Sequence, residues 1–304
     1  MKKIVSLFII VGFFVIMLIF PRQTFEGASN GLLLWFQIVL PTLLPFIILS
    51  NLLIHTNAVT YISSIVKPFV QRLFRVSDYG CYAVFVGFLC GYPMGAKVVA
   101  DLIQTEKISQ REGQYLLSFC NNTSPMFIIS FIVMQQFKNE SLLLGTLMIL
   151  YLAPVLCSFV FRRFYQVKKH SYSETNHSKE AFLFDFNLLD NCIMNGFETI
   201  TKVGGYIILF SILFALIKQF PLVWLIPTLE ISCGISYITS LAIPLATVYP
   251  YVLALTSFGG FCAIAQTNSM IQESKLSILP YITQKLITAF LTYLLASIYI
   301  NYIY

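Results

Sequence analysis

The stretch from Ile231 to Gln272 contains no Asp, Glu, Lys or Arg, and this feature limits the possible folds more than any other. One helical crossing of a bilayer takes about 20 residues, so a stretch of this length must turn back or cross twice. A second charge-free stretch runs from Gly27 to Val66. Over the whole chain 58% of the residues are hydrophobic and 11% are charged, too few charges to solvate the surface of a soluble protein. The sequence therefore predicts an all-α, polytopic membrane helix bundle.

This composition excludes a soluble enzyme, a secreted disulfide scaffold and, despite the net charge of +6, a nucleic-acid-binding protein. The seven cysteines lie almost entirely inside apolar runs without C-x-x-C spacing, so we interpret them as small buried residues. No Ser/His, His-Glu-x-x-His or paired-Asp arrangement lies in the predicted spans. We expect no catalytic residue, no cofactor and no metal site. The expected partners are the lipid bilayer and a small-molecule substrate of anionic character, and homo-oligomerisation stays open.

The apolar runs predict about six full spans and two or three broken or re-entrant segments. The run from Ile4 to Phe20 is long enough to cross a bilayer and has no A-x-A cleavage pattern after it, which favours an uncleaved first helix. The run from Gly31 to Ile54 contains two prolines and should be kinked or locally open. Between Tyr61 and Arg75 apolar and basic residues take opposite helical faces, which is typical of a helix in the membrane interface, here bent at Pro68. The other apolar runs are Tyr79 to Ala96, Gly113 to Phe137, Ser141 to Phe161, Val203 to Phe220 and Leu279 to Tyr302.

Loop charge and a weak repeat predict the topology. The stretch from Arg162 to Glu180 is rich in Lys and Arg, and the positive-inside rule places this main connecting loop in the cytoplasm. The chain also repeats at a constant offset, so that Gly91 corresponds to Gly259 and Lys107 to Lys275. The flanking charges give the two halves opposite topology. Inverted repeats with paired breaks in apolar segments indicate a secondary transporter with its site at the repeat interface.

The first break is the sequence from Gly91 to Lys97. Its glycines permit unusual backbone angles and its proline removes a backbone donor, so the helix must stop and restart. A restarted helix presents free N–H groups that favour an anion, and Lys97 adds a positive charge. The alternative is a packing kink in which Asp101 neutralises Lys97 one turn later. The candidate substrate-binding residues here are Gly91, Tyr92, Pro93, Gly95 and Lys97.

The second break is the polar sequence from Ser118 to Pro125 in the middle of a charge-free run. Polar side chains at bilayer depth are costly if they face lipid. Asn121 and Asn122 could offer donors and acceptors to a polar solute, and Ser124 is the third candidate residue of this group. The alternative is interhelical hydrogen bonding that only holds the bundle together.

Two further features lie in the second half. Glu230 is the only charge between Lys218 and Glu273. An intramembrane carboxylate is a functional hypothesis by default, here for coupling by proton or cation exchange, and the alternative is a wet interfacial turn. The last break contains Gly259 and Gly260, and these residues and the later Gln266 are candidate binding residues. The alternative interpretation of this segment is a kink followed by a polar turn outside the membrane.

These residues also carry a resemblance to a known family. The chain resembles the sporulation integral membrane protein YlbJ family, within the wider group of nucleoside-recognition or gate-domain membrane proteins. The similarity covers about residues 30 to 300. The matching motifs are Leu40-Pro41-Thr42-Leu43-Leu44-Pro45-Phe46, Gly91-Tyr92-Pro93-Met94-Gly95-Ala96-Lys97, Cys120-Asn121-Asn122-Thr123-Ser124-Pro125, Leu229-Glu230 with Gly234, and Ser257-Phe258-Gly259-Gly260 with Gln266.

The resemblance implies a multi-pass protein of the bacterial cytoplasmic membrane or the outer forespore membrane. It implies export of dipicolinic acid, a planar aromatic dianion, during sporulation. A nucleoside-type transporter and a structural or regulatory gate-domain protein without transport are the alternatives. The expected division of the chain is a transmembrane anchor (1–26), a first gate-like repeat (27–161), a basic cytoplasmic loop (162–187) and a second gate-like repeat (188–304).

Overall fold

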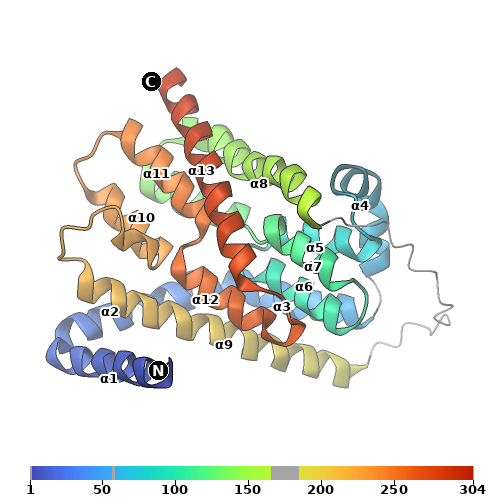
Figure 1. The fold of residues 1–304 in the computed structure, drawn as a ribbon, viewed down its shortest axis with the longest axis horizontal. Coiled ribbons are helices and arrows are strands. Elements are labelled where there is room, and N and C mark those ends of the chain that lie inside the picture. The colour runs from blue at the N-terminus through green and yellow to red at the C-terminus, as the bar shows by residue number, and fades with distance from the viewer. Residues whose placement is uncertain (1, 57–58, 166–184, 304) are drawn as a thin grey trace.

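The computed structural model describes residues 2–56, 59–165 and 185–303, which form helices joined by short turns (Figure 1). No β-strand occurs in these ranges, so the predicted helical membrane bundle is confirmed. Within the described residues, four helical segments are long and apolar enough to cross a membrane, and a bent pair at the N-terminus raises the number to five if it counts as one span. The four are Glu140–Tyr165, Phe186–Ile217, Leu245–Ser274 and Ile278–Tyr302. The expectation of about six full spans is therefore corrected, because breaks divide two of the predicted runs into short helices.

The bent pair consists of α1 (Lys2–Ile19) and α2 (Pro21–Leu34), with an angle of 105° between Ile10–Ile19 and Pro21–Val39. Pro21 occupies the first turn of α2, where a missing N–H costs no helical hydrogen bond, so the chain can start a new helix in a new direction. The predicted first helix is thus present, although its run turns sharply into the next helix.

Helix α2 packs closely along α9 (Phe186–Ile217), and the two lie side by side in Figure 1. A Cβ added at Gly27 would lie 2.7 Å from the Cα of Ile212, and one at Gly31 would lie 2.9 Å from the Cα of Ile208. Small residues that let backbones approach are a common basis of helix association in membranes.

The double-proline run follows α2 without a turn. A π-helical segment, η1 (Trp35–Val39), leads into α3 (Leu40–His55), which contains Pro41 in its first turn and Pro45 in its interior. The wider π-helical turn lies directly before these prolines, where helical hydrogen bonds are lost. The predicted local opening of this span is therefore observed. Trp35 anchors it to α9 by donating its Nε1–H to the Ile200 carbonyl at 2.9 Å.

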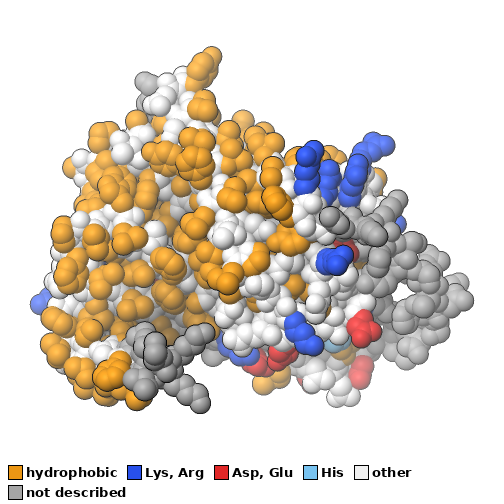
Figure 2. Space-filling view, viewed as in Figure 1, with side chains coloured by type: hydrophobic (Ala, Val, Ile, Leu, Met, Phe, Trp, Pro, Cys, Tyr) orange, Lys and Arg blue, Asp and Glu red, His pale blue; other side chains and the backbone are white. Residues whose placement is uncertain are grey.

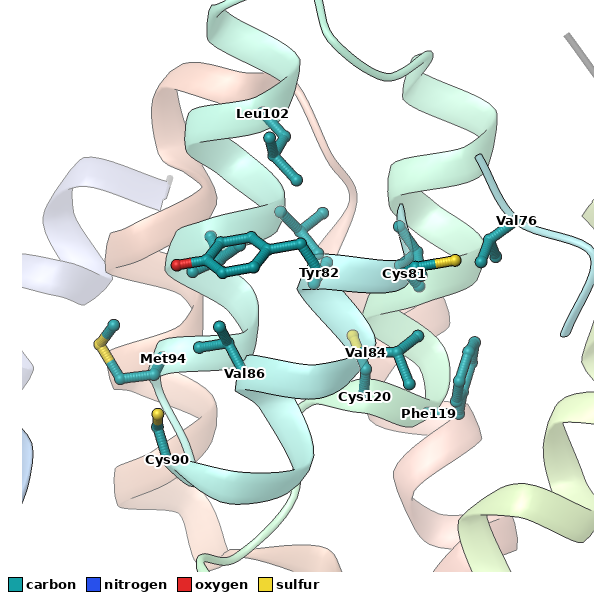
Figure 3. Close-up of a cluster of buried hydrophobic side chains, with 14 of the residues drawn as sticks. Val76, Cys81, Tyr82, Val84, Val86, Cys90, Met94, Leu102, Phe119 and Cys120 are labelled. Carbon is teal, nitrogen blue, oxygen red and sulfur yellow. The ribbon is translucent and has the colours of Figure 1, made fainter. Parts of the chain in front are cut away.

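The next four helices lie together at one end of the molecule. They are α4 (Val59–Phe74), α5 (Asp78–Leu89), α6 (Met94–Gln104) and α7 (Gln110–Cys120). The predicted amphipathic helix corresponds to α4, in which Phe69 is 72% exposed while Val70 and Phe74 are buried. Phe74 stacks on Phe119 of α7, with ring centroids 4.7 Å apart. In Figure 3, Phe119 and Cys120 lie beside Val84 of α5, within the core of these helices.

The rest of the chain forms the longer helices and the turns between them. The first group is η2 (Phe127–Phe137), η3 (Glu140–Leu142) and α8 (Leu143–Tyr165). The basic loop expected at 162–180 lies outside the described residues from position 166 onward. After α9 come η4 (Ile226–Thr228), α10 (Ile231–Ser240), α11 (Leu245–Phe258), α12 (Gly260–Ile271), η5 (Gln272–Ser274) and α13 (Ile278–Ile303). The charge-free run from Ile231 therefore turns between α10 and α11, as its length requires.

Cysteine burial and charge distribution agree with a membrane protein. Six of the seven cysteines are buried and Cys233 is partly buried, all as free thiols. Figure 2 shows apolar side chains over most of the visible face, whereas charged side chains gather toward the end that holds α4. Among the described residues three charged side chains are buried, and one of them, Glu112, lies at the charged end, where it accepts a hydrogen bond from the Ser77 backbone N–H. The other two lie in the apolar part of the molecule. They are Glu230, 4% exposed, and Lys285 of α13, 2% exposed.

Candidate functional site

The first break is the tip of a short helical hairpin. Helices α5 and α6 pack against each other and are joined by four residues, in which Gly91 adopts φ +85°. The far ends of the hairpin also meet, since the Lys107 ammonium lies 5.2 Å from the ring centroid of Tyr79. An ordinary residue would be strained at Gly91, and its Cβ would lie 2.8 Å from the backbone nitrogen of Ser124. The first two breaks are therefore in contact.

Helix α7 places the second break against this tip. The carbonyl of Cys120, its last residue, fits into the space left by Gly87 of α5 and Gly95 of α6. The chain then leaves helical geometry at Asn121 and resumes it near Ser124. Glycine at two facing positions is thus what lets the end of α7 lie between the arms of the hairpin.

Asn121 holds three elements together. Its Oδ1 accepts a hydrogen bond from the backbone N–H of Ala96 at 3.3 Å, in the first turn of α6. Its Nδ2 lies 2.9 Å from both the Thr267 hydroxyl of α12 and the Tyr281 hydroxyl of α13. One of the free N–H groups expected at the restarted helix is therefore occupied by this side chain, which is fully buried.

Lys97 forms the ion pair with Asp101 that the alternative interpretation, a packing kink, predicts. Its ammonium lies 3.2 Å from both carboxylate oxygens of Asp101, one turn later on α6, and the two side chains are 12% and 22% exposed. Lys97 does not line the cavity described next.

A cavity lies where the helix breaks converge. Its empty volume is about 710 Å³, counting the part open to the outside. The predicted site residues that line it are Gly91, Tyr92, Ser124, Glu230, Gly259 and Gln266. Pro93, Gly95, Lys97, Asn121, Asn122 and Gly260 lie outside its lining. The wall also contains residues that sequence reasoning did not select, among them Thr123, Phe127, Ser130, Ser232 and Cys262.

The break in the second half completes this wall. Gly259 ends α11 with φ +87° and Gly260 begins α12 with φ +77°. A Cβ at Gly259 would lie 3.6 Å from the ring of Tyr92, so the two glycine breaks face each other. Gly260 instead packs against the Thr228 carbonyl, 2.9 Å from where its Cβ would be. Gln266 donates its Nε2–H to the Cys262 sulfur at 3.3 Å, one turn away on α12.

Among the described residues that line the cavity, Glu230 is the only one with a charged side chain. It lies at the N-terminus of α10, where its Oε2 accepts a hydrogen bond from the Cys233 backbone N–H at 2.8 Å. This is the geometry of a helix N-cap, and the helix dipole there stabilises negative charge. The carboxylate therefore has both a structural partner and access to the cavity.

Lys285 is a buried cation that the sequence reasoning missed. Its ammonium lies 3.3 Å from Asn122 Oδ1 and 3.3 Å from the Ser257 carbonyl. The sequence does contain a signal for it, because Lys285 is the only charged residue in the final apolar run from Leu279 to Tyr302, just as Glu230 is the only charged residue between Lys218 and Glu273.

Comparisons with known proteins agree with the resemblance in the motifs. Residues 36–140 match the family model Gate, described as nucleoside recognition. The chain is also similar to the sporulation integral membrane protein YlbJ of Bacillus subtilis (strain 168), with 26% identity over 88% of this chain and 75% of that protein. No solved structure matches. The predicted resemblance is thus confirmed, and the chain is a multi-helix membrane protein that is similar to YlbJ and whose first half contains a segment that matches the Gate model.

Proposed function

We propose that this protein is a secondary transporter that moves a small polar or anionic solute across a membrane through the cavity at the helix breaks. The observation that carries the proposal is the meeting of three breaks, from both halves of the chain, around one cavity that contains Glu230. Backbone that leaves helical geometry inside a membrane is tolerated where it is packed in protein or lines a cavity. Paired broken helices around a buried site are characteristic of secondary transporters.

The cavity wall suits a small solute that has both a ring and polar groups. Tyr92 and Phe127 supply aromatic surface, while Gln266, Ser124 and Ser130 supply donors and acceptors. A mostly apolar wall with a few polar groups is typical of small-molecule sites. Dipicolinic acid, the solute implied by the family resemblance, has such a ring together with two carboxylates.

Glu230 gives the proposal its coupling step. An anionic solute and an ionised Glu230 would repel each other in the same cavity, so we propose that binding of the anion is accompanied by a proton on Glu230. The solute and the proton would then cross together. By the same resemblance, the proposed location is the bacterial cytoplasmic membrane or the outer forespore membrane.

A nucleoside is the second candidate solute. The Gate match, described as nucleoside recognition, covers 36–140 and includes the first two breaks. A base could stack on Tyr92 or Phe127, while its polar edge meets the amide of Gln266. Both candidates use the same cavity.

The test is transport by the purified protein in liposomes. Vesicles that contain it should take up labelled dipicolinate, or a labelled nucleoside, faster than empty vesicles, and unlabelled solute should compete. Gly259→Val, which places a branched side chain at a positive φ beside Tyr92, should block uptake while the protein still inserts. Gly12→Val is the matched control, because a Cβ at Gly12 meets nothing within 4 Å. Absence of uptake for the whole panel would favour a structural or regulatory protein without transport.

A further inference from the structure

Lys285 lies behind the cavity wall, between the ends of two broken helices. Helix α7 ends at Cys120 and helix α11 at Phe258. The Lys285 ammonium lies 3.3 Å from Asn122 Oδ1, just beyond the end of α7, and 3.3 Å from the Ser257 carbonyl in the last turn of α11. Carboxyl ends of helices carry partial negative charge and carbonyls without helical partners. A cation at this point therefore meets two such ends at once.

Asn122 connects the ammonium to the α7 end. Its Nδ2–H donates to the Phe119 carbonyl at 2.6 Å, a carbonyl in the last turn of α7. Its Oδ1 is then directed to Lys285. Asn122 thus accepts a hydrogen bond from the Lys285 ammonium and donates one to a carbonyl at the end of α7. One side chain therefore connects the positive charge to the end of this helix.

The remaining surroundings of the ammonium are neutral. The ring centroid of Tyr281, one turn earlier on α13, lies 5.9 Å from Nζ, in the range of a cation–π contact. Within the described residues, Lys285 forms no ion pair with a carboxylate, whereas four other lysines do. Neutral oxygens at helix ends are the ligands that broken-helix transporters offer to a free monovalent cation.

We propose that the Lys285 ammonium is a tethered cation that occupies a monovalent-cation site between the carboxyl ends of α7 and α11. Its positive charge holds the two breaks together from behind the cavity. Removal of the side chain down to Cβ leaves the oxygens of Asn122 and Ser257 facing a space that a small free cation, such as ethylammonium or Na⁺, can fill. This site is distinct from the cavity and does not depend on which solute is carried.

The experiment measures thermal unfolding of the purified protein in detergent. The wild type, Lys285→Ala and Lys285→Met are compared in choline chloride, ethylammonium chloride and sodium chloride at equal ionic strength. Lys285→Ala should unfold at a lower temperature than the wild type in choline chloride, and ethylammonium or Na⁺ should restore part of the loss. The wild type should show no such response. Lys202→Ala, at an exposed ion pair on α9, is the control and should unfold like the wild type in all three salts.

Lys285→Met distinguishes charge from volume, because methionine fills the space without a charge. It should also unfold at a lower temperature, without a response to ethylammonium. A Met variant as stable as the wild type would overturn the proposal, and this outcome can be read even if Lys285→Ala fails to fold. An equal response to ethylammonium in the wild type, or no response in a folded Lys285→Ala, would overturn it too. These readouts need no substrate, so the proposal can fail or stand independently of the proposed transport.

Discussion

At the scale of single residues, Glu230 is the group on which the proposed coupling depends. Its carboxylate caps α10 through the Cys233 N–H and lines the cavity. Glu230→Gln keeps an oxygen for this hydrogen bond but cannot take up and release a proton. We expect loaded vesicles to continue exchanging internal for external solute, while accumulation of solute driven by a pH gradient is lost. Glu140→Gln, at an exposed position, is the control and should retain both activities. Unchanged pH-driven accumulation in Glu230→Gln would leave Glu230 with only its capping role.

The Lys97–Asp101 pair provides the second prediction at this scale. The structure places both side chains mostly inside the protein, 3.2 Å apart and away from the cavity lining. Lys97→Ala leaves the Asp101 carboxylate without its partner, and loss of one member of a buried pair costs about 3–5 kcal/mol. Transport should therefore fall in Lys97→Ala and recover in the Lys97→Ala/Asp101→Asn double variant.

The double variant separates the two readings of Lys97. If Lys97 itself binds an anionic solute, neutralising Asp101 cannot replace the missing positive charge, and the double variant stays inactive. The amount of protein folded in the membrane, measured alongside, shows whether the single variant is lost through stability. Lys67→Ala, at an exposed ion pair between α4 and α5, should change neither quantity.

At the scale of secondary-structure elements, the hairpin of α5 and α6 depends on close backbone contact. Gly87 and Gly95 leave room for the Cys120 carbonyl at the end of α7. A methyl group at either position would push this carbonyl away, and overpacking of this kind costs about 1–3 kcal/mol. Gly95→Ala should therefore lower the thermal unfolding midpoint, whereas Gly205→Ala on α9, where a Cβ meets nothing within 4 Å, should not. Equal midpoints for the two variants would show that the end of α7 can shift at no cost.

The breaks themselves could be predicted from the sequence, because glycine, proline and runs of polar residues have direct effects on the backbone. The positions near Gly91, Asn121 and Gly259 are all observed as helix ends. The partners of the polar side chains could not be predicted in the same way. Asn121 and Asn122 offer the same donors and acceptors to a solute or to a neighbouring helix. Only the packing shows that Asn121 joins α6, α12 and α13, while Asn122 joins α7 to Lys285.

The expectation of about six full spans was too high because local sequence does not show how neighbouring segments pack. Hydropathy counts apolar residues, but it does not measure how far a helix continues before it turns. The run from Gly113 to Phe137 contains no charged residue, yet α7 ends at Cys120 and a separate helix, η2, begins at Phe127. Each of these helices is shorter than the roughly 20 residues of a full crossing.

At the scale of the whole molecule, the relation of the two halves decides how the protein lies in the membrane. The turns that correspond by the sequence offset lie side by side, since Gln104 Nε2 is 3.2 Å from Glu273 Oε2. Gln114 also exchanges two hydrogen bonds of 2.9 Å with the backbone of Ser277. A repeat that is inverted across the membrane would put these turns on opposite sides. The contacts therefore favour a parallel relation for these segments, contrary to the inverted topology that the loop charges predict.

Cysteine labelling in intact cells tests this arrangement. The wild-type cysteines are buried or partly buried, so they should give little background with a membrane-impermeant thiol reagent. We expect Gln110→Cys and Ser277→Cys, at the two adjoining turns, to be labelled from the same side. Glu140→Cys should be labelled from the other side, because α8 separates it from Arg162, whose guanidinium donates to the Leu73 carbonyl at the α4 end. The side of Gln110 should be the cytoplasm, since the basic residues around α4 and the end of α8 satisfy the positive-inside rule there. Labelling of Gln110→Cys and Ser277→Cys from opposite sides would restore the inverted repeat and would require these two turns to separate in the membrane.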